Sequence, residues 1–201
     1  MATSSRSFIR STGVAIRLML LATVVLGIAY PVAVWGVGQA AFHDQANGSI
    51  VSRDGKPVGS SLIGQSFAGE QADRWFQSRP SAAGEDGYDA NASSGSNLGP
   101  SNPDLTKAIE ARKAAIAAAD GVPAADVPAD AVTASGSGLD PDISPEYALE
   151  QVSRVASARG LSSSVVRALV ESHTEGRQLG VLGAPAVNVL SLNLAVASLS
   201  A

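Results

Sequence analysis

Two glycine- and serine-rich stretches carry residue types that could bind an anion. Backbone amides of such loops can converge on one concavity, and a helix that begins directly after a loop adds partial positive charge there. The candidate residues are Ser94, Gly95, Ser96, Asn97, Ser135, Gly136, Ser137 and Gly138. Neither stretch contains the GK[ST] sequence of a P-loop, so a tight structural loop or a partner contact is the favoured interpretation.

Hydrolytic or metal chemistry would depend on two histidines. His43 and His173 lie in no HExxH pattern, and the abundant serines form no GxSxG elbow. His43 is best explained as an interfacial residue at the end of an apolar run. An extracytoplasmic hydrolase that uses His173 with Glu171 or Glu175 is the alternative. The chain has no cysteine, which excludes thiolate metal sites, a cysteine nucleophile and disulfides.

An uncharged run, residues 18–41, precedes all of these candidates. Its 24 residues would form a helix of about 36 Å, which is enough to cross a hydrocarbon core of about 30 Å. Residues 1–17 contain three arginines and no acid. The positive-inside rule therefore predicts a basic cytoplasmic segment over residues 1–17, a transmembrane helix over 18–41 and a soluble extracytoplasmic domain over 42–201.

Small and aromatic residues in this run predict how it packs. Pro31 predicts a kink, Trp35 suits the outer interface, and Gly27, Gly36 and Gly38 allow a neighbouring helix to approach closely. A cleaved secretory signal is the alternative, because small residues follow Gly38. The run is longer than the usual signal core, which favours an anchor.

The charge balance constrains the partners of the exported part. Three of the 14 Lys and Arg residues and none of the 18 acidic residues precede residue 43, so the remainder holds 11 basic and 18 acidic residues, a net charge of −7. This sign disfavours nucleic-acid binding. The length of the remainder suits one domain with a modest core.

The sequence predicts some of the elements that must position the two loops. Asp54-Gly55 between residues 50–53 and 58–63 predicts a hairpin, with Pro57 pushing its strand to an edge. Residues 65–103 predict an irregular loop that leads into a helix capped by Asn102 and ending before Gly121.

Three further segments follow this helix. Residues 121–131 predict a surface crossing. Helices are predicted from Ser144 to Gly160 and from Ser162 to about residue 170, and residues 187–199 fit either a strand or a helix capped by Asn188. Together these patterns predict a mixed α/β domain with a small sheet and three or four helices, preceded by one transmembrane helix.

Several motifs in order along the chain resemble one family, the C subunit of the Kdp potassium-transporting P-type ATPase. The segments that carry this resemblance are Ser61-Leu62-Ile63-Gly64-Gln65 with Phe67, Trp75-Phe76, Arg79-Pro80-Ser81-Ala82, Tyr88-Asp89, GSNLGPSNP at 95–103, VTASGSGLDP at 132–141, Arg154-Val155-Ala156, Val187-Asn188-Val189-Leu190 and Leu192-Asn193. The resemblance covers nearly the whole chain. Its main departures are the Ala-rich residues 114–131 and Gly183-Ala184-Pro185-Ala186.

The resemblance implies a non-catalytic subunit of a complex in the bacterial plasma membrane. Its partners would be a potassium-translocating subunit, an ATP-hydrolysing subunit and a small single-span subunit. The implied role is assembly, and the family is also proposed to act as a catalytic chaperone that raises the ATP affinity of the hydrolysing subunit. ATP is cytoplasmic, whereas the arginines predict both Gly/Ser loops outside, so no bound cofactor is expected on this chain and ATP is expected on the partner.

Overall fold

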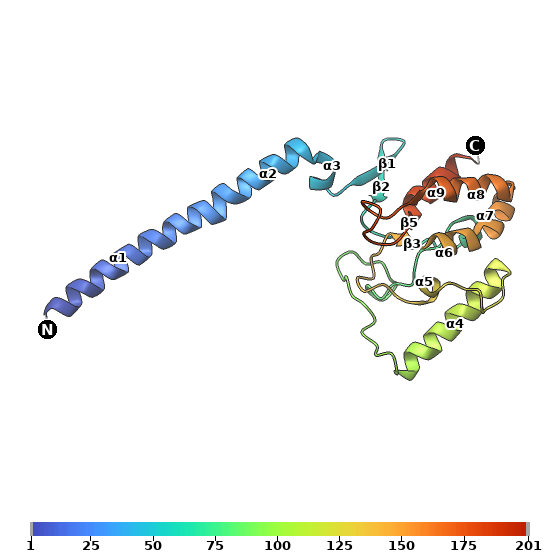
Figure 1. The fold of residues 1–201 in the computed structure, drawn as a ribbon, viewed down its shortest axis with the longest axis horizontal. Helices are drawn as coiled ribbons and strands as arrows, with labels where there is room; N and C mark the ends of the chain where they lie inside the picture. The colour runs from blue at the N-terminus through green and yellow to red at the C-terminus, as the bar shows by residue number, and fades with distance from the viewer. Residues whose placement is uncertain (1, 200–201) are drawn as a thin grey trace. The chain divides into compact units, whose positions relative to one another are not determined.

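The computed structural model describes residues 2–199, which form two compact units, one up to Ser49 and one from Ile50 onward. The first unit is helical and consists of α1 (Ala2–Val24), a π-helical turn (Val25–Ala29), α2 (Tyr30–Ala41) and α3 (His43–Ala46) (Figure 1). Within the described residues, one helix, Ser7–Ala41, is long and apolar enough to cross a membrane. The predicted apolar helix is confirmed and extends further toward the N-terminus.

The position of the predicted kink at Pro31 is occupied by a π-helical turn directly before the proline. The Tyr30 amide bonds to the Val25 carbonyl, five residues back. Proline lacks an N–H, and its ring clashes with the carbonyl four residues earlier in a regular α-helix. A wider turn at this place relieves that conflict.

The glycines of the span differ in what surrounds them. A Cβ added at Gly36 would meet nothing within 4 Å, whereas one at Gly38 would lie 3.5 Å from the Ala46 side chain. A Cβ at Gly27 would be 3.9 Å from Thr23. Trp35 is exposed. Gly36 therefore presents an open small-residue face, while Gly38 already packs against α3 of its own chain.

The second unit begins with the predicted hairpin, β1 (Ile50–Arg53) and β2 (Lys56–Ser60), paired antiparallel. Asp54 and Gly55 both have positive φ, 51° and 73°, which matches a type I′ turn. The second strand begins at Lys56, two residues before the predicted start, and Pro57 lies opposite Ser52 beside a register shift.

Side-chain caps set the helix boundaries of the second unit. The helices are α4 (Pro103–Asp120), α5 (Ala129–Val132), α6 (Pro145–Glu150), α7 (Val152–Arg159), α8 (Ser163–Ser172) and α9 (Val189–Ser198). Asn102, Ser144, Ser162 and Asn188 each accept a hydrogen bond from an amide of the following first turn. Gly121 and Gly160 end α4 and α7 in the left-handed conformation. These predicted starts and stops are confirmed.

Two expectations need correction, and one choice that the sequence left open is resolved. The single helix predicted from Ser144 to Gly160 is interrupted at Gln151, between α6 and α7. The segment 121–131 is not only a surface crossing, because Val127 and Ala131 are buried in the core. The final segment is a strand and a helix in succession, because Asn188 ends β5 (Ala186–Asn188) and caps α9.

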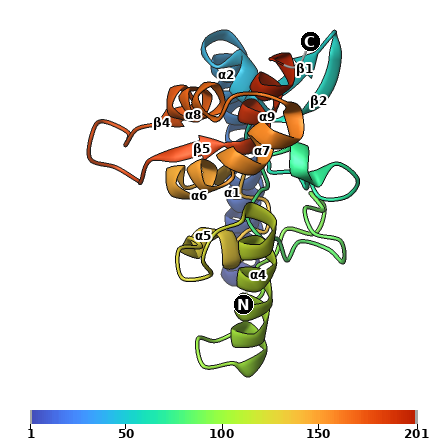
Figure 2. The same ribbon diagram turned by 90° about the vertical axis from the view of Figure 1, so that its right-hand side faces the viewer.

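A small antiparallel sheet shares the core with α5, α6, α7, α8 and α9. The sheet has the order β3 (Asp142–Ile143), β5, β4 (Thr174–Glu175). Figure 2 shows α6, α7, α8 and α9 gathered around β5. Val187 on β5 and Leu192 on α9 are fully buried with Val155 and Val166 from α7 and α8. The predicted mixed α/β fold with a small sheet is confirmed.

Candidate functional site

The two Gly/Ser stretches meet, 44 residues apart in sequence. The Ser94 amide and the Ser93 hydroxyl both donate to the Ser137 carbonyl, each at 2.9 Å. A Cβ at Gly95 would stand 3.0 Å from the Gly136 carbonyl oxygen. The glycines here allow two backbones to approach closely. We call this contact between residues 93–95 and 136–138 the loop junction.

Ser81 and Gly138 anchor the loop junction on the segment that precedes it. The Ser81 hydroxyl donates to the Gly138 carbonyl at 2.6 Å and accepts from the Tyr88 amide at 2.8 Å. The Tyr88 hydroxyl donates to the Arg79 carbonyl at 2.6 Å. Burial is the main cause that raises the pKa of Tyr88, so this hydroxyl stays protonated and keeps donating at neutral pH.

An ion pair closes the other side of the loop junction. Arg79 Nη1 lies 2.7 Å from Asp140 Oδ2, and both side chains are partly buried. The Gly64 amide donates to the Leu139 carbonyl at 2.9 Å, and a Cβ at Gly64 would collide with the backbone of Asp140. Five of the motifs noted in the sequence thus converge on one structural feature.

This geometry bears on the predicted anion site. The Ser94 amide is occupied by Ser137, and the Ser135 amide donates to the Pro80 carbonyl at 3.3 Å. Ser96, Asn97 and Ser137 are exposed. The amides of a nest must be free to converge on a ligand, and here two of them hold protein carbonyls instead. The candidate residues are brought together, and anion binding by them stays a prediction.

Two buried amide side chains hold the extended segment Phe76-Gln77. Asn193 accepts from the Phe76 amide at 2.8 Å and donates to the Phe76 carbonyl at 2.9 Å. Gln151 accepts from the Gln77 amide at 2.6 Å and donates to the Gln77 carbonyl at 3.2 Å. Each side chain therefore pairs with a peptide as a neighbouring strand would. We call these four bonds the amide clamp.

Arg154 ties the same segment to two helices. Its Nη1 donates to the carbonyls of Ala72, Asp73 and Trp75, and its Nε lies 2.5 Å from Asp120 Oδ1. Its Nη2 donates to Gln151 Oε1 at 2.8 Å. Sequence patterns did not single out Gln151. Gln151 is a polar residue at a position where the helical repeat predicts an apolar one, and this mismatch could have indicated a buried hydrogen-bonding role.

His173 lies at the end of α8, and its Nδ1 is 2.9 Å from the Leu169 carbonyl oxygen. Among the described residues it makes no hydrogen bond or ion pair with Glu171 or Glu175, both of which are exposed. His43 lies in α3 near Asn47. No group of three metal-ligating side chains occurs within residues 2–199.

Glu150, at the end of α6, has a strongly perturbed carboxyl. Burial, followed by the charges of Asp120, Asp130 and Asp126, raises its pKa to about 7. Its Oε1 is buried without a hydrogen-bond partner in the described part of the chain. A carboxyl whose pKa rises on folding binds its proton more tightly in the folded state, so stability falls as pH increases from about 4.5 to 7.

Replacing Glu150 by glutamine is therefore expected to raise the thermal unfolding midpoint at pH 8 and to change it little at pH 4.5. The neutral amide avoids the cost of burying a charge beside other carboxylates. Thermal unfolding of both proteins at the two pH values measures this difference. Glu146→Gln on the exposed face of the same helix is the matched control. Equal shifts for the two variants would contradict the assignment.

Comparison with known proteins covers nearly the whole chain. Residues 12–198 match the family model described as "KdpC: K+-transporting ATPase, c chain". The chain belongs to the KdpC family. It is 58% identical over 192 residues to a protein of Kineococcus radiotolerans, which covers 96% of this chain and 95% of the relative.

Other KdpC relatives are similar over the same range. A protein of Sorangium cellulosum is 56% identical, with 90% of this chain and 94% of the relative covered, and one of Mycobacterium bovis is 54% identical, with 90% and 95% covered. All three bear the name potassium-transporting ATPase KdpC subunit. The matched KdpC region includes most of the apolar helix, the loop junction and the amide clamp.

Proposed function

We propose that the chain is a non-catalytic, single-span subunit of a potassium-transporting P-type ATPase in the bacterial plasma membrane. Its family membership and the apolar helix Ser7–Ala41 support this proposal. The partners are a potassium-translocating subunit, an ATP-hydrolysing subunit and a small single-span subunit. The span packs on the translocating subunit through the faces around Gly27, Pro31, Trp35 and Gly36.

The proposed orientation has the N-terminus in the cytoplasm and the second unit outside. Arg10 and Arg17 precede the uncharged run, and no acid does. The acidic second unit lies over the outer entrance and raises the local potassium concentration modestly, within a Debye length of about 8 Å.

ATP is bound by the hydrolysing subunit in this proposal. The chain raises the ATP affinity of that subunit through contacts in the assembled complex, as the chaperone role requires. The contacts of His173 do not support a hydrolase centred on this residue, because His173 Nδ1 lies against the backbone carbonyl of Leu169.

Co-purification tests the assembly role. A tagged full-length chain should retain the translocating and hydrolysing subunits in mild detergent, and a chain without residues 18–41 should lose them, because one apolar helix supplies the contact within the bilayer. Retention of an intact, active complex without those residues would refute anchoring. Protease applied to the outer face of the membrane should cut at the exposed Arg53-Asp54 turn. Cleavage only from the inner face would refute the orientation.

A further inference from the structure

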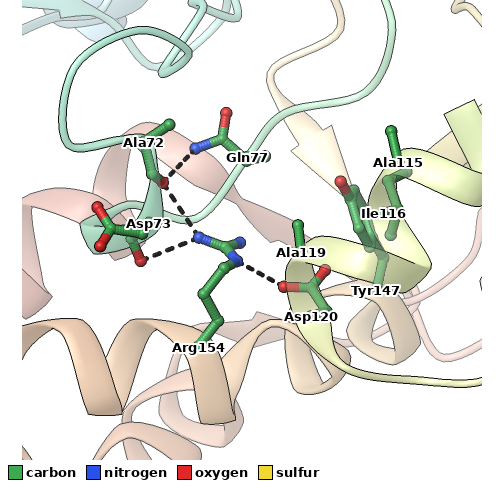
Figure 3. A pocket seen from close by; sticks show the side chains of 9 residues that line it. All are labelled: Ala72, Asp73, Gln77, Ala115, Ile116, Ala119, Asp120, Tyr147 and Arg154. Carbon is green, nitrogen blue, oxygen red and sulfur yellow. Dashed lines mark hydrogen bonds and ion pairs between the residues drawn. The ribbon is translucent and has the colours of Figure 1, made fainter.

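A cavity of about 410 Å³ lies between α4 and the segment held by the amide clamp. Figure 3 shows its apolar wall, formed by Ala115, Ile116 and Ala119 of α4, and its polar side, formed by Asp120, Tyr147 and Arg154. Cavities of this size hold small ligands, and such sites combine apolar walls with a few convergent polar groups. The cavity is separate from the loop junction and shares no residue with it.

Tyr147 brings an unused hydrogen-bonding group to this cavity. The residue is only 3% exposed, yet its hydroxyl makes no hydrogen bond to any residue between 2 and 199. Figure 3 draws Tyr147 and Ile116 among the side chains that line the cavity. Burial, followed by the charge of Asp120, raises the pKa of Tyr147, so the group is neutral at physiological pH. Tyrosine hydroxyls both donate and accept hydrogen bonds, so at the wall of this cavity the group is free to bond to a ligand.

Asp120 adds an acceptor of fixed orientation. Its side chain is 3% exposed, and Oδ1 pairs with Arg154 Nε. Within the described chain, its second oxygen, Oδ2, accepts no hydrogen bond. The other donors of Arg154 are committed to three backbone carbonyls and to Gln151. The guanidinium therefore offers little to an incoming anion.

The electrostatic surroundings favour a cation. Asp120, together with Asp126 and Asp130, is close enough to Glu150 to disfavour its ionisation. Asp73 also lines the cavity. Two acidic residues, Asp73 and Asp120, thus line the cavity beside one arginine whose donors are committed, and a positive group would gain attraction there where an anion would not.

We propose that this cavity binds a primary alkylammonium group. The apolar stem lies along Ala115, Ile116 and Ala119, and the ammonium donates to Asp120 Oδ2 and to the Tyr147 hydroxyl. Ammonium has three donors and no acceptor, which matches a site with two free acceptors. A free organic amine and a lysine side chain of a partner subunit share this chemistry. The inference does not depend on the proposed assembly role.

The proposal is tested by measuring the affinity of n-butylammonium for the full-length chain in detergent with ligand-observed NMR. The neutral analogue 1-butanol should bind about tenfold more weakly, since hydrogen bonds to charged groups are the stronger ones. Tyr147→Phe should weaken ammonium binding about tenfold, and it removes a hydroxyl that stabilises no other group. Ala115→Leu should abolish binding by filling the cavity. Ala114→Leu is the matched control, because Ala114 is exposed like Ala115 and lies outside the cavity lining.

Equal affinities for the ammonium and the alcohol, or unchanged binding in Ala115→Leu, would overturn the proposal. Unchanged unfolding midpoints of Tyr147→Phe and Ala115→Leu show that a loss of binding does not come from misfolding. The assembled complex then distinguishes the sources. Loss of n-butylammonium binding on assembly assigns the cavity to a partner lysine, and retained binding assigns it to a free amine.

Discussion

Replacing Asn193 by alanine is expected to lower the free energy of unfolding of the second unit by about 3 kcal/mol. The side chain satisfies both the N–H and the C=O of Phe76, a residue with no exposed surface. Each buried backbone group left without a partner costs about 1–3 kcal/mol. Asn193→Leu is expected to destabilise as strongly, because it restores volume and leaves both groups unpaired.

Urea unfolding in detergent measures this effect. The chain has two tryptophans, so a Trp35→Phe background leaves Trp75, next to the amide clamp, as the single reporter. Ser198→Ala on the exposed end of α9 is the matched control and should change stability by less than about 0.5 kcal/mol. A loss below about 1 kcal/mol for both Asn193 variants would show that the clamp contributes little.

Replacing Gly138 by alanine is expected to cost about 3 kcal/mol, through two separable terms. The position has φ +67°, which alanine adopts at a cost of about 1 kcal/mol. The added Cβ would also stand 2.5 Å from the Ser94 carbonyl oxygen and 2.8 Å from the Ala83 amide nitrogen. Both are backbone atoms, one in the loop junction and one in the preceding segment that anchors it, so the contact is relieved only by moving backbone away from Gly138.

Gly121→Ala isolates the conformational term of this prediction. Gly121 has nearly the same φ, +69°, and nothing within 4 Å of an added Cβ. The difference between the two variants in free energy of unfolding, measured in urea, therefore reports only the steric contact of the Cβ added at position 138. If Gly138→Ala costs no more than Gly121→Ala, the loops move apart freely, and the loop junction is not a fixed contact.

Local chemistry made much of the fold predictable. Asn102, Ser144 and Asn188 cap helices because their side chains bond to first-turn amides, and this depends only on nearby residues. The hairpin at Asp54-Gly55 follows equally from the positive φ of its turn. Such features are encoded within a few residues, and a single sequence suffices to recognise them.

Features that depend on distant partners were not predictable in the same way. The break between α6 and α7 lies at Gln151, whose buried side chain bonds to Gln77, 74 residues away. No local sequence pattern predicts such a pair. Val127 lies in a segment rich in Ala and Pro, and only packing against the core explains its burial. The two Gly/Ser stretches could be identified from the sequence, whereas their mutual contact depends on tertiary structure.

The cavity beside α4 was not foreseen for the same reason. Ala115 and Ala119 look like ordinary helix-forming residues, and Tyr147 like a core aromatic. Their significance arises only where α4 lies beside α7 and the Ala72–Arg74 turn. The sequence alone offered no sign that the Tyr147 hydroxyl would lack a partner.

The amide clamp joins residues that the ribosome adds at widely different times. Phe76 and its partner Asn193 are 117 residues apart, and ribosomes add about 5–20 residues per second. Phe76 is therefore made roughly 6–23 s before the side chain that pairs with its peptide exists. Throughout that interval the Phe76 peptide lacks the side chain that pairs with it, so this contact cannot form before the last helix of the described chain has been synthesised.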